Sequence, residues 1–269
     1  MSSPLNIALR TRLVRHMVEV VNDTPLEVHP FPHFCVQGFL PRDTYEQLLA
    51  SFPPEEHYEA FAYEKHHHKD GESNRKRFQM KNAWLDKLPG DSRSFWYSVR
   101  SALGSEELKQ AAFAKVTPGL TLRYRVADWQ ARDLPGFALP ELFRETEGYS
   151  IAPHPDTRKK VVTMQIALAA DKSQEPFGTE FYQRSLNPLS WLREPRGFET
   201  VKRMPFLPNT AYAFSVLNTL TLKSWHGRTA ISGQLGVRNS LLNIWYEKAE
   251  NSNTELAAER TMFRQAKAA

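Results

Sequence analysis

The feature that most constrains the fold is a series of short runs rich in Val, Thr, Tyr, Ile and Phe, which extends from about residue 119 to 247. Pro, Gly, Asn and Asp separate these runs, as is typical of short β-strands joined by turns. No strand–helix–strand alternation is visible, so a parallel doubly wound sheet is disfavoured. We therefore predict a mainly β sandwich or barrel whose strands are "LTLRYRVA", "YSIAPHPD", "KKVVTMQIALAAD", "GTEFYQ", "NTAYAFSVLN", "LKSWHGR" and "VRNSLLNIWYEK".

The chain on either side of this core is predicted to be helical or irregular and to pack on it as part of one globular unit. The N-terminal region covers 1–118, the core 119–247 and a C-terminal helix 248–269, in which Ser252 and Glu255 have capping-box spacing. Within the N-terminal region we expect a helix over 1–22, a short strand over 29–41, a helix over 41–53 capped by Asp43 or Thr44, and one or two helices over 92–115.

Charge and cysteine content limit the classes of function. The formal net charge is +5, which is low for a dedicated nucleic-acid binder, so no nucleic-acid partner is expected. An anionic substrate or peripheral contact with a membrane surface remains open. No stretch approaches about 18 consecutive apolar residues, so we expect no integral membrane span. The single cysteine, Cys35, has apolar neighbours, which indicates a buried thiol in a reducing compartment and a cytoplasmic protein.

The chemistry is predicted to centre on "GYSIAPHPDTRKKVVTMQIAL", residues 148–168. Side chains on a strand alternate between faces, so His154 and Asp156 would point the same way, roughly 6.6 Å apart. The only later histidine is His226, which follows a strand-like run and could fold back beside the pair. Two imidazoles and one carboxylate form the facial triad of non-haem Fe(II) oxygenases. A zinc hydrolase could use the same ligand types, whereas a closed structural zinc site would need four ligands.

A second pair of polar residues lies in "GVRNSLLNIWY". Arg238 and Ser240 are two apart on a predicted strand and so share a face. The planar fork of an arginine suits a carboxylate, and a serine hydroxyl beside it adds a donor. Apolar neighbours indicate that this arginine faces inward rather than into solvent, and the pair is therefore predicted to bind an anion.

Taken in order, His154-x-Asp156, His226 and Arg238-x-Ser240 resemble the motifs of the 2-oxoglutarate/Fe(II)-dependent dioxygenases, in the branch that includes prolyl hydroxylases and phytanoyl-CoA hydroxylase. In that family an HxD…H triad binds iron, and an arginine beyond the distal histidine, often in an RxS motif, binds the C5 carboxylate of 2-oxoglutarate. Here the gap from His226 to Arg238 is twelve residues. The resemblance covers about residues 119–247. It implies a double-stranded β-helix, the cupin-like jelly roll, in the core.

The activity that the resemblance implies is hydroxylation of an aliphatic C–H bond, with Fe(II) as cofactor and 2-oxoglutarate and O₂ as co-substrates. His154, Asp156 and His226 would be both metal ligands and catalytic residues, and Arg238 and Ser240 would bind 2-oxoglutarate. The nucleic-acid demethylase branch has a second arginine six residues beyond the first. Ile244 occupies that position here, which argues against nucleic-acid repair.

The substrate is less constrained. Basic residues near the predicted site favour a small anionic metabolite such as an amino acid, an acidic sugar or a lipid-linked group. A peptide or protein hydroxylase, a cupin-like metal-binding protein without oxygenase activity, and a non-enzymatic binding module remain open alternatives. So does the role of the His66–His68 run, which is predicted to be a solvated loop. Arginines that could contact the substrate or 2-oxoglutarate are Arg123, Arg125, Arg144 and Arg158.

Overall fold

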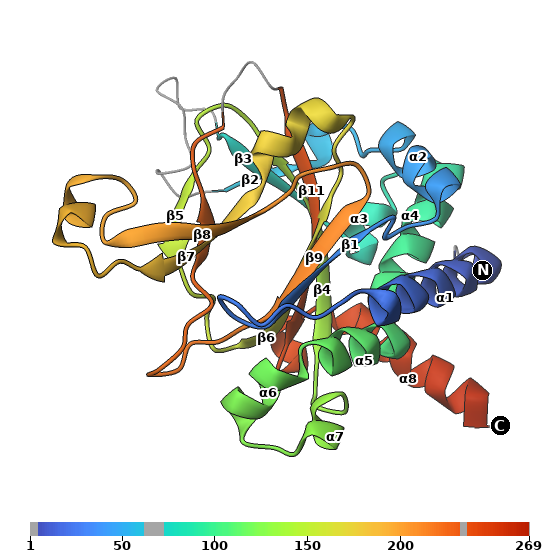
Figure 1. Ribbon diagram of the computed structural model, residues 1–269. Coiled ribbons are helices and arrows are strands. Elements are labelled where there is room, and N and C mark those ends of the chain that lie inside the picture. The colour runs from blue at the N-terminus through green and yellow to red at the C-terminus, as the bar shows by residue number, and fades with distance from the viewer. Residues whose placement is uncertain (1–4, 62–72, 232–235, 269) are drawn as a thin grey trace.

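Two facing antiparallel sheets form the centre of the molecule (Figure 1). The computed structural model describes residues 5–61, 73–231 and 236–268. Within these residues the larger sheet has the strand order β1-β9-β6-β11-β4-β3-β2, and the smaller has the order β5-β10-β7-β8. From β4 to β11 the chain passes between the two sheets at every step except the β7–β8 hairpin. This is the path of a double-stranded β-helix, so the predicted jelly roll is confirmed.

The strands are short, as the sequence pattern indicated. Their bounds are β1 His33–Gln37, β2 Glu59–Ala60, β3 Arg75–Gln79, β4 Phe137–Glu145, β5 Ile151–His154, β6 Lys160–Ala167, β7 Thr179–Arg184, β8 Phe198–Met204, β9 Thr210–Ser215, β10 His226–Arg228 and β11 Arg238–Tyr246. The N-terminal region contributes β1, β2 and β3 to the edges of the larger sheet, beside the jelly-roll strands β9 and β4.

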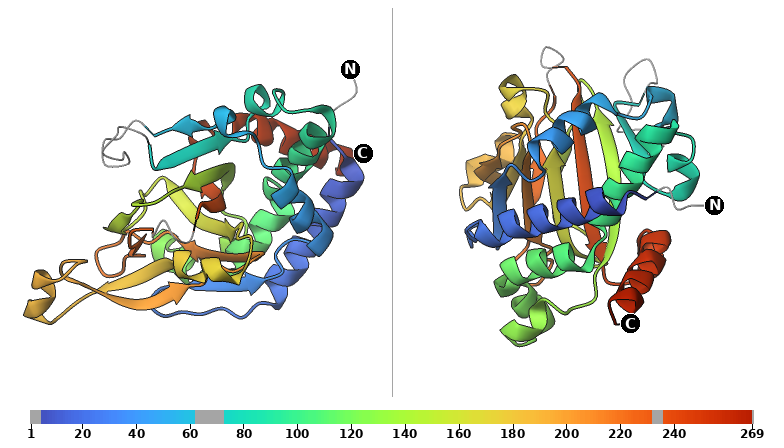
Figure 2. Two further views of the ribbon diagram at one scale, coloured as in Figure 1. Left: turned by 90° about the horizontal axis from the view of Figure 1, so that it is seen from above. Right: turned by 90° about the vertical axis from the view of Figure 1, so that its right-hand side faces the viewer.

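Helices cover the outer face of the larger sheet (Figure 2). Their bounds are α1 Ile7–Asp23, α2 Arg42–Ala50, α3 Asn82–Leu85, α4 Gly90–Leu103, α5 Glu106–Lys115, α6 Thr117–Tyr124, α7 Asp128–Ala131 and α8 Thr254–Ala268. The helices predicted over 1–22 and 41–53 are therefore confirmed, and the stretch 92–115, predicted to form one or two helices, forms two, α4 and α5. No helix in the described ranges has both the length and the apolar character that crossing a bilayer requires.

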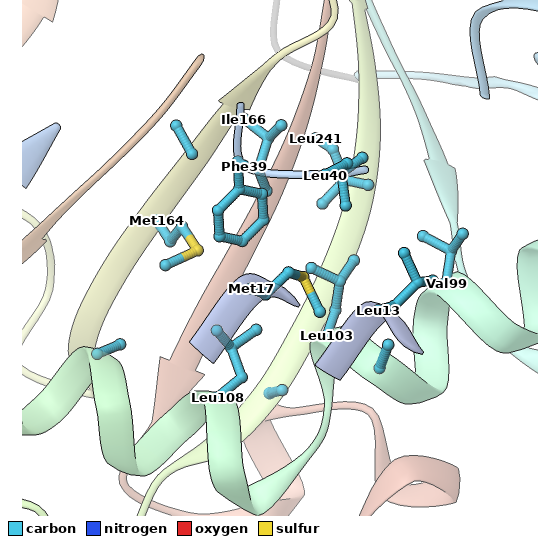
Figure 3. Close-up of a cluster of buried hydrophobic side chains, with 14 of the residues drawn as sticks. Leu13, Met17, Phe39, Leu40, Val99, Leu103, Leu108, Met164, Ile166 and Leu241 are labelled. Atoms are coloured by element: carbon cyan, nitrogen blue, oxygen red, sulfur yellow. The ribbon is translucent and has the colours of Figure 1, made fainter. Parts of the chain in front are cut away.

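The main hydrophobic core lies between this helical layer and the larger sheet (Figure 3). Leu13 and Met17 of α1 and Leu103 of α4 pack towards Met164 and Ile166 of β6, and none of these side chains is more than 1% exposed. Burying one such side chain contributes about 1.5–3 kcal/mol to stability. The core thus holds the larger sheet rigidly, and its other face is free to line the space between the sheets.

The strand predicted at "LTLRYRVA" (120–127) is wrong, because residues 120–124 lie in α6 and the helix ends at Arg125. Pro118 stands in the first turn of the helix, where its missing N–H costs nothing. Gly119 brings α6 so close to β9 that a Cβ atom here would lie 1.9 Å from the Ser215 hydroxyl oxygen. The alternating apolar residues suggested a strand, but the Pro-Gly pair starts a helix that packs on the sheet.

Four strands, β2, β3, β4 and β8, escaped the sequence analysis. β2 and β3 lie on either side of the His66–His68 run, in a polar stretch that carries little strand pattern. In β4, "FALPELFRE", Pro140 and three charged residues obscure the strand pattern. The neighbouring β3 pairs only with 141–145, so Pro140 lies where one side of β4 has no partner strand, and a proline is tolerated there. β8 is an edge strand whose sequence "FETVKRM" is mostly polar.

The predicted helix caps are also wrong. Helix α2 is preceded by Pro41 and has no side-chain cap, while Asp43 lies in its first turn and pairs with Arg12. Helix α8 is capped by Asn253 rather than Ser252. The Asn253 side-chain oxygen accepts hydrogen bonds from the backbone N–H groups of Glu255 and Leu256, at 3.1 and 3.3 Å.

The connection between β7 and β8 extends away from the body of the molecule (Figure 2). It carries an unusual number of exposed apolar side chains: Leu186 is 98% exposed, Leu192 is 80% exposed, and Leu189 and Trp191 are also largely exposed. We refer to residues 185–197 as the β7–β8 tip.

Candidate active site

Strand pairing in the smaller sheet brings together the three residues of the predicted triad. β10 runs antiparallel to β5, and the first residue of β10, His226, pairs directly with the last residue of β5, His154. Asp156 lies just beyond the end of β5 rather than within it. One ligand atom from each of the three residues lies within 4.8 Å of the other two. The predicted convergence of His226 on the His154–Asp156 pair is therefore present in the fold.

Both imidazoles are oriented by backbone hydrogen bonds at Nδ1. His154 Nδ1 lies 3.0 Å from the Ala152 carbonyl oxygen, and His226 Nδ1 lies 2.9 Å from that of Ser224. A proton on Nδ1 leaves Nε2 with its lone pair, as in most histidine ligands of metals. Burial lowers the pKa of His226 to about 4 and also lowers the pKa of His154. Both rings are therefore neutral at pH 7 and can act as metal ligands.

The carboxylate of Asp156 is buried and held from two sides. Lys160 donates to one oxygen, and the Thr163 hydroxyl donates to the other at 2.7 Å. Burial alone would raise the pKa of Asp156, but the attraction of Lys160 and of His226 outweighs it and holds the pKa below its usual range. The group is thus an anion at every pH at which the histidines are neutral.

Arg238 and Ser240 share the inward face of β11, as predicted, and both are buried. The guanidinium of Arg238 already has protein partners. It is paired with Glu145, donates from Nε to the Phe177 carbonyl oxygen at 2.9 Å, and lies 3.3 Å from the Ser240 hydroxyl. Glu145 ends the unpredicted strand β4, directly opposite Arg238 in the sheet. An internal carboxylate therefore occupies part of the fork that was expected to be open.

The sequence analysis missed Arg228, two residues beyond His226 on β10. This side chain is 6% exposed and lies against the rings of Tyr149 and Phe177. It donates from Nη1 to the Phe177 carbonyl oxygen at 2.9 Å, so one carbonyl accepts from both Arg228 and Arg238. Burial, followed by the like charge of Arg238, lowers the pKa of Arg228 to about 10, which still leaves it charged at pH 7. The two-residue spacing in "HGR" was the available signal.

A cavity of about 140 Å³ connects the triad with these arginines. Its walls include His154, Asp156 and His226 at one end, and Arg228 and Arg238 at the other. A third arginine, Arg75 from β3, lines it too and lies 3.2 Å from the second Glu145 oxygen. Because both sheets contribute, the cavity lies between the two layers of the jelly roll.

Several other candidates from the sequence have structural partners instead. Arg123 donates to the carbonyl groups of Lys160 and Val216, and pairs with Glu247. Arg144 pairs with Glu55, and Arg158 donates to the Asn218 carbonyl oxygen. Neither these three arginines nor Arg125 is among the residues found to line the cavity. The His66–His68 run lies outside the described residues.

The residues fit a divalent iron ion. Two neutral imidazoles with Nε2 available, and a carboxylate that stays charged, supply the donor set of a facial triad. Both imidazoles have the outer hydrogen bonds that orient metal ligands. Fold and site together define a class of protein: a double-stranded β-helix whose two sheets enclose a His–Asp–His cluster and an arginine-rich cavity.

Comparisons with solved structures identify the same fold. The chain aligns with a prolyl-4-hydroxylase from Pseudomonas putida over 86% of its own length and 99% of the other chain, with a TM-score of 0.50 and 12% identity. Other matches are a 2OG-Fe(II) oxygenase family oxidoreductase from Burkholderia pseudomallei (91% and 93% covered, TM-score 0.42, 10% identity) and the epimerase SnoN of nogalamycin biosynthesis, in complex with Fe³⁺ and alpha ketoglutarate (90% and 85%, TM-score 0.43, 12%).

No protein-family model and no curated protein matches the sequence. At identities this low the structural likeness establishes the fold. The chain shares this fold with a prolyl-4-hydroxylase, so the jelly roll implied by the motif resemblance is confirmed.

Proposed function

We propose that this protein is a 2-oxoglutarate- and O₂-dependent non-haem iron hydroxylase that acts on an aliphatic C–H bond of a small anionic metabolite. The observation that carries the proposal is the convergence of three metal-ligating atoms within 4.8 Å, beside a cavity lined by arginines. The jelly-roll fold supports it, because the site lies between the sheets at the ends of β5 and β10.

In this proposal His154, Asp156 and His226 hold Fe(II) from one side. When bound, the iron supplies the oxidising chemistry, using O₂ and electrons from the decarboxylation of 2-oxoglutarate to succinate. The protein positions the reactants. Phe214 packs against the His226 ring, with centroids 4.8 Å apart, and excludes water from that side of the ligand. Thr163 orients the Asp156 carboxylate through one oxygen, and Lys160 holds the other oxygen.

The opposite end of the cavity is suited to carboxylates. We propose that the second carboxylate of 2-oxoglutarate lies at the arginine end, to which Arg238 and Ser240 contribute. An arginine positioned by several hydrogen bonds binds a carboxylate with little loss of side-chain freedom. Ser240 adds a hydroxyl close to Arg238.

The charges around the cavity support an anionic substrate. Among the described lining residues four are cationic and two are carboxylates: Arg75, Lys160, Arg228 and Arg238 against Glu145 and Asp156. A divalent metal adds further positive charge, and one dianionic co-substrate does not neutralise the total. A second anion is therefore favoured over a neutral molecule.

The test is anaerobic titration of the full chain with Fe(II), with and without 2-oxoglutarate, watching for the weak visible absorption of iron chelated by a 2-oxo acid. We expect this absorption in the wild type and in His29→Ala, which alters an exposed imidazole, and its loss in His226→Ala. Iron binding without the absorption would favour the cupin-like alternative. The absence of iron binding would overturn the proposal.

A further inference from the structure

Arg228 is a buried cation that forms no ion pair with a carboxylate among the residues that the structure describes. Its side chain donates to two backbone carbonyl groups, those of Phe177 and Thr229. Among the described residues no carboxylate oxygen lies within 4.0 Å of its nitrogen atoms. The nearby Glu145 is already shared, because Arg238 pairs with one of its oxygens and Arg75 with the other. Two arginines thus use the only carboxylate at this end of the described cavity lining, and Arg228 has none.

A charge in this position favours the binding of a ligand. Removing a guanidinium from water without a counter-ion is costly, and carbonyl dipoles offset only part of that cost. An anion that enters the cavity would offset the rest of this desolvation cost. Arg238 gains less from the same anion, because Glu145 already neutralises it. Of the two arginines, Arg228 therefore has the greater electrostatic gain from a bound carboxylate.

Arg228 also lies on the same strand as a histidine of the triad. His226 and Arg228 are two apart on β10, so their side chains leave the same face of the strand, roughly 6.6 Å apart along it. Both line the same cavity. A short dicarboxylate with its 2-oxo acid end at the triad would therefore extend its other carboxylate along the same cavity towards Arg228.

We propose that Arg228 is the residue that directly binds the distal carboxylate of 2-oxoglutarate, and that Arg238, held by Glu145, is a positioning residue. This inference rests on the proposed function and assigns the anion contact within it. The Phe177 carbonyl group accepts from both arginines and so fixes the Arg228 guanidinium beside that of Arg238. Arg238 and Glu145 together keep the Arg228 side chain directed into the cavity.

The experiment is calorimetric binding to the full chain loaded with Mn(II), which gives a readout independent of turnover. The two ligands are 2-oxoglutarate and 2-oxopentanoate, which has the same chain length but a methyl group in place of the distal carboxylate. We expect the wild type to prefer 2-oxoglutarate by roughly tenfold to a hundredfold, the range for a hydrogen bond to a charged group. In Arg228→Gln this preference should largely disappear, with 2-oxopentanoate binding unchanged.

Three further variants make the result decisive. Arg228→Lys keeps the charge and should retain part of the preference. Arg184→Gln alters an exposed arginine on the neighbouring strand β7 and should leave it intact. The double variant Glu145→Gln, Arg238→Gln removes the ion pair as a unit, and should reduce the preference less than Arg228→Gln does. Thermal unfolding of each variant separates loss of binding from loss of fold.

If the preference survives in Arg228→Gln and disappears in the double variant, Arg238 is the direct contact and the inference is wrong. If the wild type binds Mn(II) but neither 2-oxo acid, the proposed function itself fails. That result differs from the first, in which 2-oxoglutarate binds but Arg228 is not its partner.

Discussion

At the scale of single residues, the arginine end of the cavity depends on one buried carboxylate. Burial alone would raise the pKa of Glu145, but Arg238, Arg75 and Arg228 together outweigh it and hold the pKa below its ordinary value. A carboxyl group whose pKa is lower in the folded state stabilises that state above its unfolded pKa. The stabilisation is lost as the pH falls from the unfolded pKa through the folded one.

The prediction concerns Glu145→Gln. At pH 7 this variant should unfold at a lower urea concentration than the wild type, because it leaves buried arginines without their anion. The difference should shrink as the pH falls below about 4.3, where the unfolded glutamate protonates. Urea unfolding from pH 7 to pH 3 measures it, with the exposed Glu56→Gln as a control that should follow the wild type. A difference that stays constant across this range would show that Glu145 is not charged in the folded protein.

Single residues also show how far the sequence determines the site. The candidates His154, Asp156, His226 and Arg238 could be named from the sequence, because their residue types and spacing are typical of a metal site and of an anion site. Glu145 could not, because its role depends on the register that sets it opposite Arg238 across β4 and β11. A one-dimensional sequence carries no register, so charges that meet only through strand pairing have to be found in the structure.

At the scale of elements, strands with a buried face were predicted best from the sequence. Elements whose structure depends on contacts with neighbouring elements were predicted worst. The runs that became β6, β9 and β11 are continuous or alternating apolar segments, and all three were predicted. The sequence analysis missed β4 because its proline and charged residues interrupt the pattern of a strand. These residues are tolerated because of how the neighbouring strands pair with β4, which the sequence does not show. The apolar alternation in α6 suits either a strand or a helix, and only Pro118 and Gly119 favour the helix.

The β7–β8 tip gives an element-scale prediction about stability. Leu186 and Leu192 are almost fully exposed, so replacing both with serine removes little buried surface. The free energy of unfolding should change by no more than about 0.5 kcal/mol. On the adjoining strand β7, Phe181 is 0% exposed, and Phe181→Ala should cost about 3–5 kcal/mol. Chemical denaturation of the two variants provides the comparison, and a large loss in the serine variant would mean that the tip leucines have a packing partner.

At the scale of the whole molecule, one buried arginine ties the C-terminal helix to the N-terminal region. Arg100 of α4 is 1% exposed and pairs with Glu255 and Glu259 of α8. These residues lie more than 150 positions apart in the sequence. The contact joins α8 to α4 within the helical layer.

Removing both acidic partners should therefore destabilise the whole molecule. In Glu255→Gln, Glu259→Gln, Arg100 becomes a buried charge without an anion, a loss of about 3–5 kcal/mol. Adding Arg100→Met to this variant should restore much of the stability, because an apolar side chain of similar length fills the site without a charge. Denaturant unfolding measures both steps, with the exposed Glu250→Gln as the control. Failure of Arg100→Met to recover stability would mean that α8 is held mainly by other contacts.

The position of β11 has a consequence for how the protein is made. This strand lies between β4 and β6 in the larger sheet, although its residues come near the end of the chain. On the ribosome, β4 and β6 emerge first and their facing edges remain without a partner until residue 246 has been synthesised. Exposed strand edges are sites of wrong pairing. From the end of β6 at Ala167 until Tyr246 has been synthesised, the growing polypeptide therefore has an open slot between two strands of the larger sheet, and the strand that fills it also delivers Arg238.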